Sequence, residues 1–164
     1  MNLLPAFTSS EALVLNSAAP SFDLLDHKGV RHSLEDYRGS WLVLYFYPKD
    51  NTPSCTAEAC ALRDNYTPLK QEQAQILGVS IGSASSHQRF AQRHQLPFPL
   101  LIDDGDLARR YHALFQLGPI KLAKRHSFII DPDGCLRKIY RKVSSRAHAQ
   151  QLIIDIQLLK DAEV

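Results

Sequence analysis

The chain has 164 residues, of which 45% are hydrophobic and 22% charged, a composition that fits one globular domain. Nineteen basic and 17 acidic residues leave a net charge of +2, which argues against nucleic acid or an anionic membrane as partner. No apolar run approaches the roughly 20 residues that a transmembrane helix needs, and residues 1–15 lack the basic residues of a secretory signal. We therefore expect an intracellular, cytoplasmic protein, in which three cysteines indicate chemistry rather than a disulfide framework.

The first part of the chain predicts an extension and a small hairpin. Residues 1–18 have no clear period, and we interpret them as an N-terminal extension that is partly ordered or docked on the sheet as an extra strand. Residues 19–164 are expected to form a single domain. This domain opens with a hairpin of residues 19–24 and 26–30, and then with a helical turn at residues 33–37 that Ser33 caps.

The stretch from Trp41 to Asp64 is the most informative part of the sequence. Residues 41–47 are all apolar or aromatic, and a proline ends the run, which predicts a strand buried on both faces. A polar turn follows, and after Pro53 the apolar residues take helical spacing. Cys55 therefore stands where a helix begins. Free backbone N–H groups and the positive end of the helix dipole favour the thiolate there, which is the nucleophilic form of cysteine.

Strands and helices alternate in the rest of the chain. Residues 75–81 predict a second buried strand, parallel to the first, with the helix after Pro53 as the crossover. Alternation of this kind, closed by a terminal hairpin, is typical of an α/β layer fold. The other predicted elements are helices at 85–94, 107–111 and 147–159, strands at 96–102, 125–131 and 136–140, and a loop at 118–121.

At this point the residues resemble a known family. Thr52-Pro53-Ser54-Cys55 is similar to the Thr-x-x-Cys active-site motif of peroxiredoxins, and the longer string from Tyr45 to Asp64 resembles their bacterioferritin comigratory protein branch, also called peroxiredoxin Q. The resemblance implies a thioredoxin-like fold, with a central mixed sheet flanked by helices. The chain departs from the family pattern at two places. Ser54 replaces a common glycine, and the segment 115–125 is shorter than in many relatives.

The same resemblance implies roles for individual residues. Cys55 would be the nucleophile, Thr52 would hydrogen-bond the peroxide oxygens, and Pro53 would shield the sulfur from water. Thr52 and Pro53 also suit a simple turn. Arg125 lies in a segment similar to the one that supplies the family's active-site arginine, and it would stabilise the thiolate. Its neighbour Lys124 is the alternative, and a solvated residue at the strand edge is the ordinary interpretation of Arg125.

The remaining cysteines are interpreted separately. Cys60 is either a thiol packed in the helix or the resolving cysteine, since its five-residue spacing from Cys55 matches one subset of the peroxiredoxin Q branch. Arg63 fits a structural ion pair, with Asp64 or another carboxylate, as well as a catalytic role. Cys135 matches no motif and is expected to be an unreactive strand thiol.

Together these features predict a thioredoxin-dependent peroxiredoxin. It would reduce hydrogen peroxide and organic hydroperoxides through a sulfenic acid on Cys55, form a disulfide with Cys60, and be recycled by thioredoxin or a similar dithiol. No metal or organic cofactor is expected, because Cys-x4-Cys lacks further zinc ligands. The resemblance implies a monomer or weak dimer. The alternatives are a redox-sensing interaction protein and a protein thiol-disulfide oxidoreductase, which the absence of Cys-x-x-Cys disfavours.

Overall fold

The computed structural model describes residues 12–163, and a mixed five-stranded sheet lies at their centre. The strand order is β5-β4-β3-β8-β9, with β3 in the middle, parallel to β4 and antiparallel to β8. This arrangement confirms the α/β prediction and the parallel pairing of the first two buried strands. The strands are β3 (Trp41–Phe46), β4 (Ala74–Ile81), β5 (Leu100–Asp103), β8 (Ser127–Ile130) and β9 (Leu136–Tyr140).

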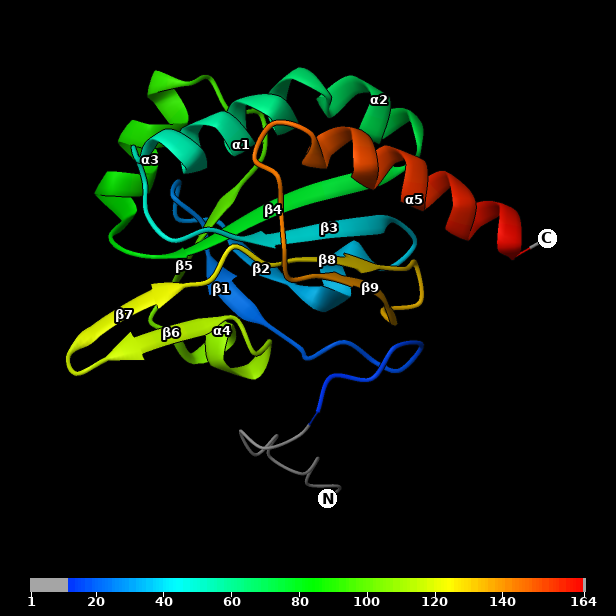
Figure 1. The fold of residues 1–164 in the computed structure, drawn as a ribbon, viewed down its shortest axis with the longest axis horizontal. Coiled ribbons are helices and arrows are strands. Elements are labelled where there is room, and N and C mark those ends of the chain that lie inside the picture. Colours follow the sequence, from blue (N-terminus) through cyan, green and yellow to red (C-terminus); the bar gives the residue numbers. More distant parts are fainter. Residues whose placement is uncertain (1–11, 164) are drawn as a thin grey trace.

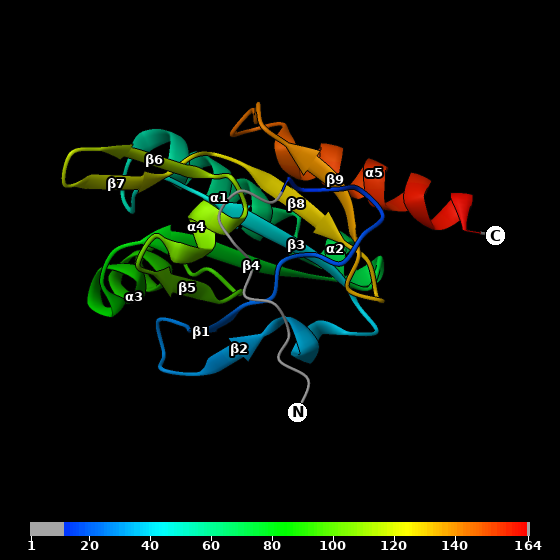
Figure 2. The same ribbon diagram turned by 90° about the horizontal axis from the view of Figure 1, so that it is seen from below.

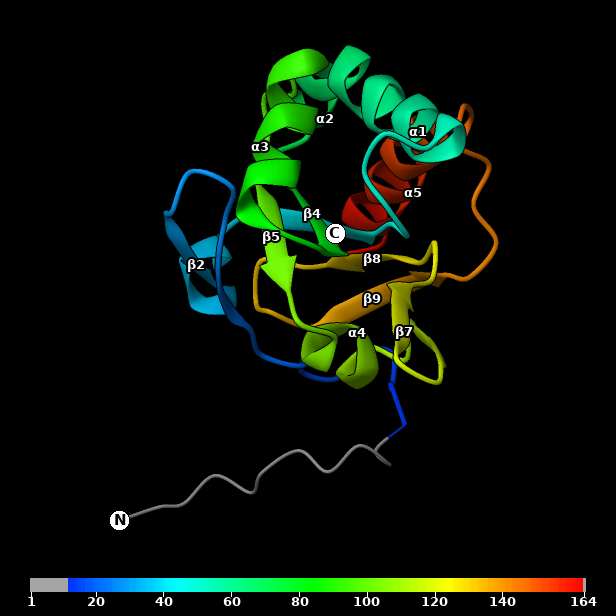
Figure 3. The same cartoon turned by 90° about the vertical axis from the view of Figure 1, so that its left-hand side faces the viewer.

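Helices cover the two faces of the sheet unequally (Figures 1 and 3). Four of them, α1, α2, α3 and α5, lie over one face, and the short α4 lies below the other. Within residues 12–163, none of the helices combines the length and the apolar character needed to cross a membrane. The bounds are α1 (Pro53–Asp64), α2 (Tyr66–Gln71), α3 (Ala84–Arg93), α4 (Asp106–Arg110) and α5 (His148–Ala162).

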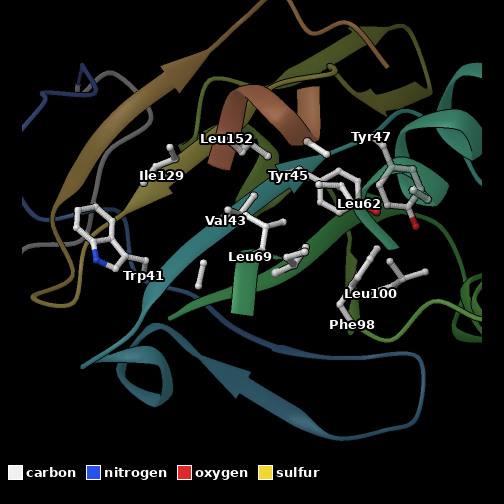
Figure 4. Packing of buried hydrophobic residues seen from close by; sticks show 14 of the residues in the cluster. Trp41, Val43, Tyr45, Tyr47, Leu62, Leu69, Phe98, Leu100, Ile129 and Leu152 are labelled. Carbon is white, nitrogen blue, oxygen red and sulfur yellow. The ribbon is translucent and has the colours of Figure 1, made fainter. Parts of the chain in front are cut away.

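The central strand β3 supplies side chains to two cores, because successive residues of a strand point to opposite faces. Val43 and Tyr45 belong to the core on the face that carries α1, α3 and α5 (Figure 4). Leu44 and Phe46 belong to the core on the α4 face. All six residues of β3 are buried, as predicted for a strand covered on both faces. Cys55 packs in the first of these cores, directly above the sheet.

The predicted N-terminal hairpin is present and lies beside the β5 edge, away from β9 (Figure 2). It consists of β1 (Asp23–Leu25) and β2 (Arg31–Ser33), which pair antiparallel. The helical turn that follows is a 3-10 helix, η1 (Leu34–Tyr37), with Ser33 at its N-cap position. The backbone N–H of Ser33 donates to the Asp36 carboxylate at 2.9 Å, which closes this first turn.

Residues 12–18 are the described part of the predicted extension. The backbones of Asn16 and Ser17 exchange hydrogen bonds with Leu136 at the start of β9, at 2.7 and 2.8 Å. Ala18 forms an isolated antiparallel bridge with Cys135. Residues 1–11 lie outside the described residues, so the division into an extension of residues 1–18 and a domain of residues 19–164 stays a prediction.

Two predicted elements need correction. The strand expected at residues 96–102 begins only at Leu100, because Pro97 and Pro99 have no backbone N–H to donate to a ladder. The loop expected at residues 118–121 is confirmed only at Gly118 and Pro119, because Ile120 already begins a strand.

That region is an antiparallel hairpin of β6 (Leu114–Leu117) and β7 (Ile120–Ala123), outside the main sheet. Gly118 adopts φ 58°, and with Pro119 it forms the two-residue turn of the hairpin. The apolar residues at its tip are exposed, so this hairpin lacks the buried apolar run that marks the other strands.

Candidate active site

The turn between β3 and α1 is anchored by the buried carboxylate of Asp50. Its oxygens bind the Tyr47 hydroxyl at 2.8 Å, the Ser86 hydroxyl at 2.8 Å and His87 Nδ1 at 2.6 Å. Burial alone would raise the pKa of Asp50, but the hydrogen bonds from His87, Ser86 and Tyr47 bring it below its ordinary value. The carboxylate therefore joins the turn before α1 to two residues of α3.

The last residues of this turn set the direction of α1. Asn51 adopts a left-handed backbone with φ 63°, a conformation that asparagine tolerates better than most residues. Thr52 occupies the N-cap position, and its hydroxyl donates to the Lys49 carbonyl at 3.0 Å. Pro53 is the first helical residue, where a missing N–H costs nothing. Cys55 thus lies in the first turn of α1, at the helix end that carries free N–H groups.

The Cys55 sulfur is buried and contacts an arginine from a distant part of the chain. Cys55 is 1% exposed, and Arg125 Nη2 donates to its Sγ at 3.1 Å. Arg125 lies in a bend just before β8, not in the strand itself. Because β8 pairs antiparallel with β3, it brings Arg125 next to the carboxyl end of β3, where α1 begins. Lys124, the alternative to Arg125, is exposed.

A buried carboxylate completes this cluster, and it is not among the residues predicted from the sequence. Glu58 is 1% exposed, and its Oε1 lies 3.4 Å from Arg125 Nη1. Burial raises the pKa of Glu58 to about 7, although the Arg125 guanidinium acts in the opposite direction. Glu58 could have been found from its spacing, because a residue three positions after Cys55 lies on the same face of the helix.

Two buried oxygens near the sulfur have no hydrogen-bond partner among the described residues: the Tyr45 hydroxyl and Glu58 Oε2. Burial raises the pKa of Tyr45 well above 10, and the nearby charges of Glu58 and Cys55 raise it further. Unpartnered buried oxygens are uncommon in native proteins, and each calls for an explanation such as a bound water or a catalytic role.

Cys60 lies further along α1, and the structure does not place it in the cluster around Cys55. It is half-buried, and its Sγ lies 3.9 Å from Nδ1 of His94, the residue that ends α3. Arg63 forms the expected ion pair with Asp64 at 3.0 Å, and its Nη1 also donates to the His94 carbonyl at 2.7 Å. Arg63 therefore joins α1 to the end of α3.

The third thiol, Cys135, lies at the turn between β8 and β9. Its backbone N–H donates to the Asp131 carboxylate at 2.9 Å, and the residue is half-buried. Within residues 12–163, His, Cys, Asp and Glu side chains form no group of three or more that could hold a metal ion. The chemistry that these residues can perform is therefore that of a buried, cation-paired thiol with a second thiol in the same helix.

Comparisons with known proteins agree with this description. A model of the AhpC/TSA family matches residues 15–139. The protein named peroxiredoxin Bcp from Bacillus subtilis (strain 168) is 37% identical over 155 residues, which cover 90% of this chain and 95% of that one. The similarity therefore spans nearly the whole of both chains.

Solved structures of similar proteins agree with the sequence comparison. A mutant of Xylella fastidiosa PrxQ superposes with a TM-score of 0.85 at 26% identity, over 92% of this chain and 99% of that one. The Xanthomonas campestris bacterioferritin comigratory protein gives 0.78 at 30% identity, over 84% and 90%. These neighbours are thioredoxin-fold proteins, which confirms the predicted fold. The chain therefore belongs to the AhpC/TSA family and, within it, to the branch of Bcp and peroxiredoxin Q proteins.

Proposed function

We propose that this protein is a thiol-dependent peroxidase in which Cys55 is the nucleophile. The observation that carries the proposal is the 3.1 Å contact between the Arg125 guanidinium and the buried Cys55 sulfur. A fixed positive charge at this distance favours the thiolate over the thiol, and the free N–H groups at the start of α1 act in the same direction. The name peroxiredoxin, which the Bacillus subtilis relative carries, supports the same assignment.

In the first step, the Cys55 thiolate attacks the distal oxygen of a hydroperoxide. The sulfur–oxygen bond forms as the O–O bond breaks, and the leaving oxygen takes up a proton as water or alcohol. The Thr52 hydroxyl donates to the Lys49 carbonyl, so its lone pairs are available to accept a hydrogen bond from the peroxide. Arg125 is placed to stabilise the charge that moves from sulfur to the leaving oxygen. Pro53, the first residue of α1, shields the sulfur from water.

In the second step, Cys60 condenses with the sulfenic acid on Cys55 to form an intramolecular disulfide. Both residues lie within α1. In an ideal helix, residues five apart have Cα atoms roughly 8.7 Å apart and point to different faces. A disulfide tolerates about 7 Å at most, so we expect the first turns of α1 to unwind before the bond forms. That opening costs a few kcal/mol of hydrogen bonds and packing.

The substrate and the reductant follow from this chemistry. Hydrogen peroxide and organic hydroperoxides are the proposed substrates, in line with the alkyl peroxide reduction named for the Xanthomonas campestris relative. The exposed disulfide of the unwound helix would be reduced by thiol exchange with thioredoxin or a similar dithiol. We propose that the protein acts in the cytoplasm, as a monomer or a weak dimer.

A coupled assay tests this function. Thioredoxin, its reductase and NADPH are mixed with the protein and a peroxide, and NADPH loss is followed. We expect continuous turnover with hydrogen peroxide and with tert-butyl hydroperoxide. Oxidation of one equivalent without turnover, together with binding of a partner in only one redox state, would favour the redox-sensing alternative. Reduction of a disulfide-bonded protein substrate, with no peroxide consumed, would favour the thiol-disulfide oxidoreductase.

A further inference from the structure

The imidazole of His94 is held beside Cys60 by contacts from two helices. Its ring packs edge-on against Phe90, with centroids 5.2 Å apart, and Phe90 is fully buried. The backbone carbonyl of His94 accepts a 2.7 Å hydrogen bond from Arg63. These two contacts fix the backbone and the ring of His94, and its Nδ1 lies 3.9 Å from the Cys60 sulfur. Nothing in the first step of the reaction uses this contact.

We propose that His94 is the general base that removes the proton of Cys60 during disulfide formation. The inference rests on the proposed function, since it requires Cys60 to be the resolving cysteine. The neutral imidazole with its proton on Nε2 presents a free lone pair on Nδ1 toward the thiol. A separation of 3.9 Å is long for a hydrogen bond to sulfur, and such bonds commonly tighten only when the reacting groups come together.

The step balances without an outside oxidant. His94 takes the proton of the Cys60 thiol and becomes an imidazolium. The Cys60 thiolate then attacks the sulfur of the Cys55 sulfenic acid, so the sulfur–sulfur bond forms while the sulfur–oxygen bond breaks. The departing hydroxide takes this proton back from the His94 imidazolium and leaves as water. The products are the disulfide and one water molecule, and His94 returns to its neutral form.

The positive charges around the pair favour the unprotonated form of each group. Partial burial lowers the pKa of His94, and the positive charges of Arg93 and Arg63 lower it further, which favours the neutral ring that can accept a proton. The pKa of Arg63 is raised by its hydrogen bond to Asp64 and, to a smaller extent, by the Cys60 sulfur. Arg63 is therefore close enough to favour a thiolate at Cys60 once the proton has left.

The location of the contact also fits the proposed unwinding. Arg63 lies C-terminal to Cys60, so the hydrogen bond from Arg63 to His94 can persist while the first turns of α1 open. Cys60 then stays at the end of α3, and the oxidised Cys55 moves to it. The expected gain is bounded, because a free thiol is already ionised to a few per cent at pH 7. Full ionisation would speed the step by about 10- to 30-fold.

Single-turnover kinetics test the proposal. Reduced protein is mixed with one equivalent of hydrogen peroxide, and the rates of sulfenic acid and disulfide formation are measured in the same reaction. In His94→Phe and in His94→Asn, we expect the ratio of the disulfide rate to the sulfenic acid rate to fall about 10-fold at pH 7. The difference should narrow near pH 9, where an ordinary thiol ionises without a base. Gln92→Ala, an exposed change on the same helix, is the matched control and should keep the wild-type ratio.

The outcomes separate the inference from the function on which it rests. A wild-type ratio in both His94 variants would overturn the role of His94, and so would full rescue by His94→Asn, which keeps a polar group but cannot take a proton. If both variants misfold, the wild-type protein supplies the test. Its rate of disulfide formation should fall as the pH is lowered, with the same midpoint pH as the NMR titration of His94. A different midpoint would overturn the proposal. Failure of the wild-type protein to form any Cys55–Cys60 disulfide would instead overturn the proposed function.

Discussion

The two thiols of α1 lie five residues apart in one helix, yet their surroundings differ. Cys55 is buried, and Arg125 and Glu58 form a charged cluster with it beneath the helix. Cys60 is half-buried at the side of the helix, and its sulfur lies 3.9 Å from His94 Nδ1. The first thiol is built into a preorganised charged site, whereas the second lies outside that site, beside the end of α3.

This difference fits two steps with different demands. Attack on a peroxide requires a charged sulfur held in a fixed place, and preorganised charges stabilise the transition state because they need not reorient. Disulfide formation requires one sulfur to reach the other, so the first turns of α1 must be able to open while the Cys60 end stays in place. If the comparison is correct, changes at the two ends of α1 should affect different steps.

Substitution of the cysteines should give the largest difference between the two thiols. Cys55→Ser should abolish peroxide consumption, because serine is not ionised at neutral pH. Cys60→Ser should consume about one equivalent of peroxide and then stop, since no disulfide forms for thioredoxin to reduce. Peroxide consumption and NADPH loss, measured together, distinguish the two outcomes. Cys135→Ser is the control and should turn over normally. Loss of turnover in Cys135→Ser alone would show that the resolving thiol has been assigned wrongly.

The next prediction concerns the cation beside Cys55. Arg125→Met should lower the second-order rate with peroxide by about 10²- to 10³-fold, the usual effect of removing one preorganised electrostatic donor. It should also slow iodoacetamide alkylation of Cys55, because the cation that contacts the reacting sulfur at 3.1 Å is removed. Lys124→Met removes a neighbouring exposed charge and is the matched control. Equal effects of the two substitutions would mean that net charge near the site, and not the 3.1 Å contact, is what matters.

Hydrogen exchange sharpens the contrast between the two ends of the helix. Reduced protein should protect the amides of residues 57–63, which are hydrogen-bonded within α1. Oxidation by peroxide should lower that protection, because the disulfide requires the first turns to unwind. The amides of α5 serve as the internal reference and should not change. Equal protection in both states, with the Cys55–Cys60 bond confirmed by mass spectrometry, would exclude the unwinding.

The smallest expected effect is on stability and comes from Glu58. Its pKa is about 7 in the folded protein, above its ordinary value near 4.5, so the folded state binds a proton more tightly than the unfolded state does. The free energy of unfolding therefore falls as the pH rises from about 4.5 to 7. Glu58→Gln removes this loss and should stabilise the protein by about 1–3 kcal/mol at pH 8, with no gain near pH 4.5.

Urea unfolding at pH 4.5, 6 and 8 measures this difference. Asp161→Asn, at an exposed carboxylate near the end of α5, is the control. A stabilisation by Glu58→Gln that is the same at all three pH values would contradict a buried carboxyl group with a raised pKa, since a packing effect does not depend on pH.

The local framework of the site could be predicted from the amino-acid sequence. A run of bulky apolar residues ended by Pro48 predicts β3, and the change to helical spacing after Pro53 predicts α1, so Cys55 could be placed at a helix start. These are properties of short stretches, because strand and helix periods and proline geometry act within a few residues. The family resemblance then supplied the thioredoxin-like fold, which the periods alone did not distinguish from other α/β layers.

Which side chains come into contact in the site depends on the packing of distant elements. Arg125 reaches Cys55 only because β8 pairs with β3, and the resemblance, not the pattern, pointed to it. The burial of Glu58 and the contact of Cys60 with His94 depend on how α1 packs on the sheet and against α3. Such contacts join residues 34 to 70 positions apart or depend on what covers a helix face. Local sequence patterns carry no information about either, because periodicity shows which face is apolar but not which element will cover it.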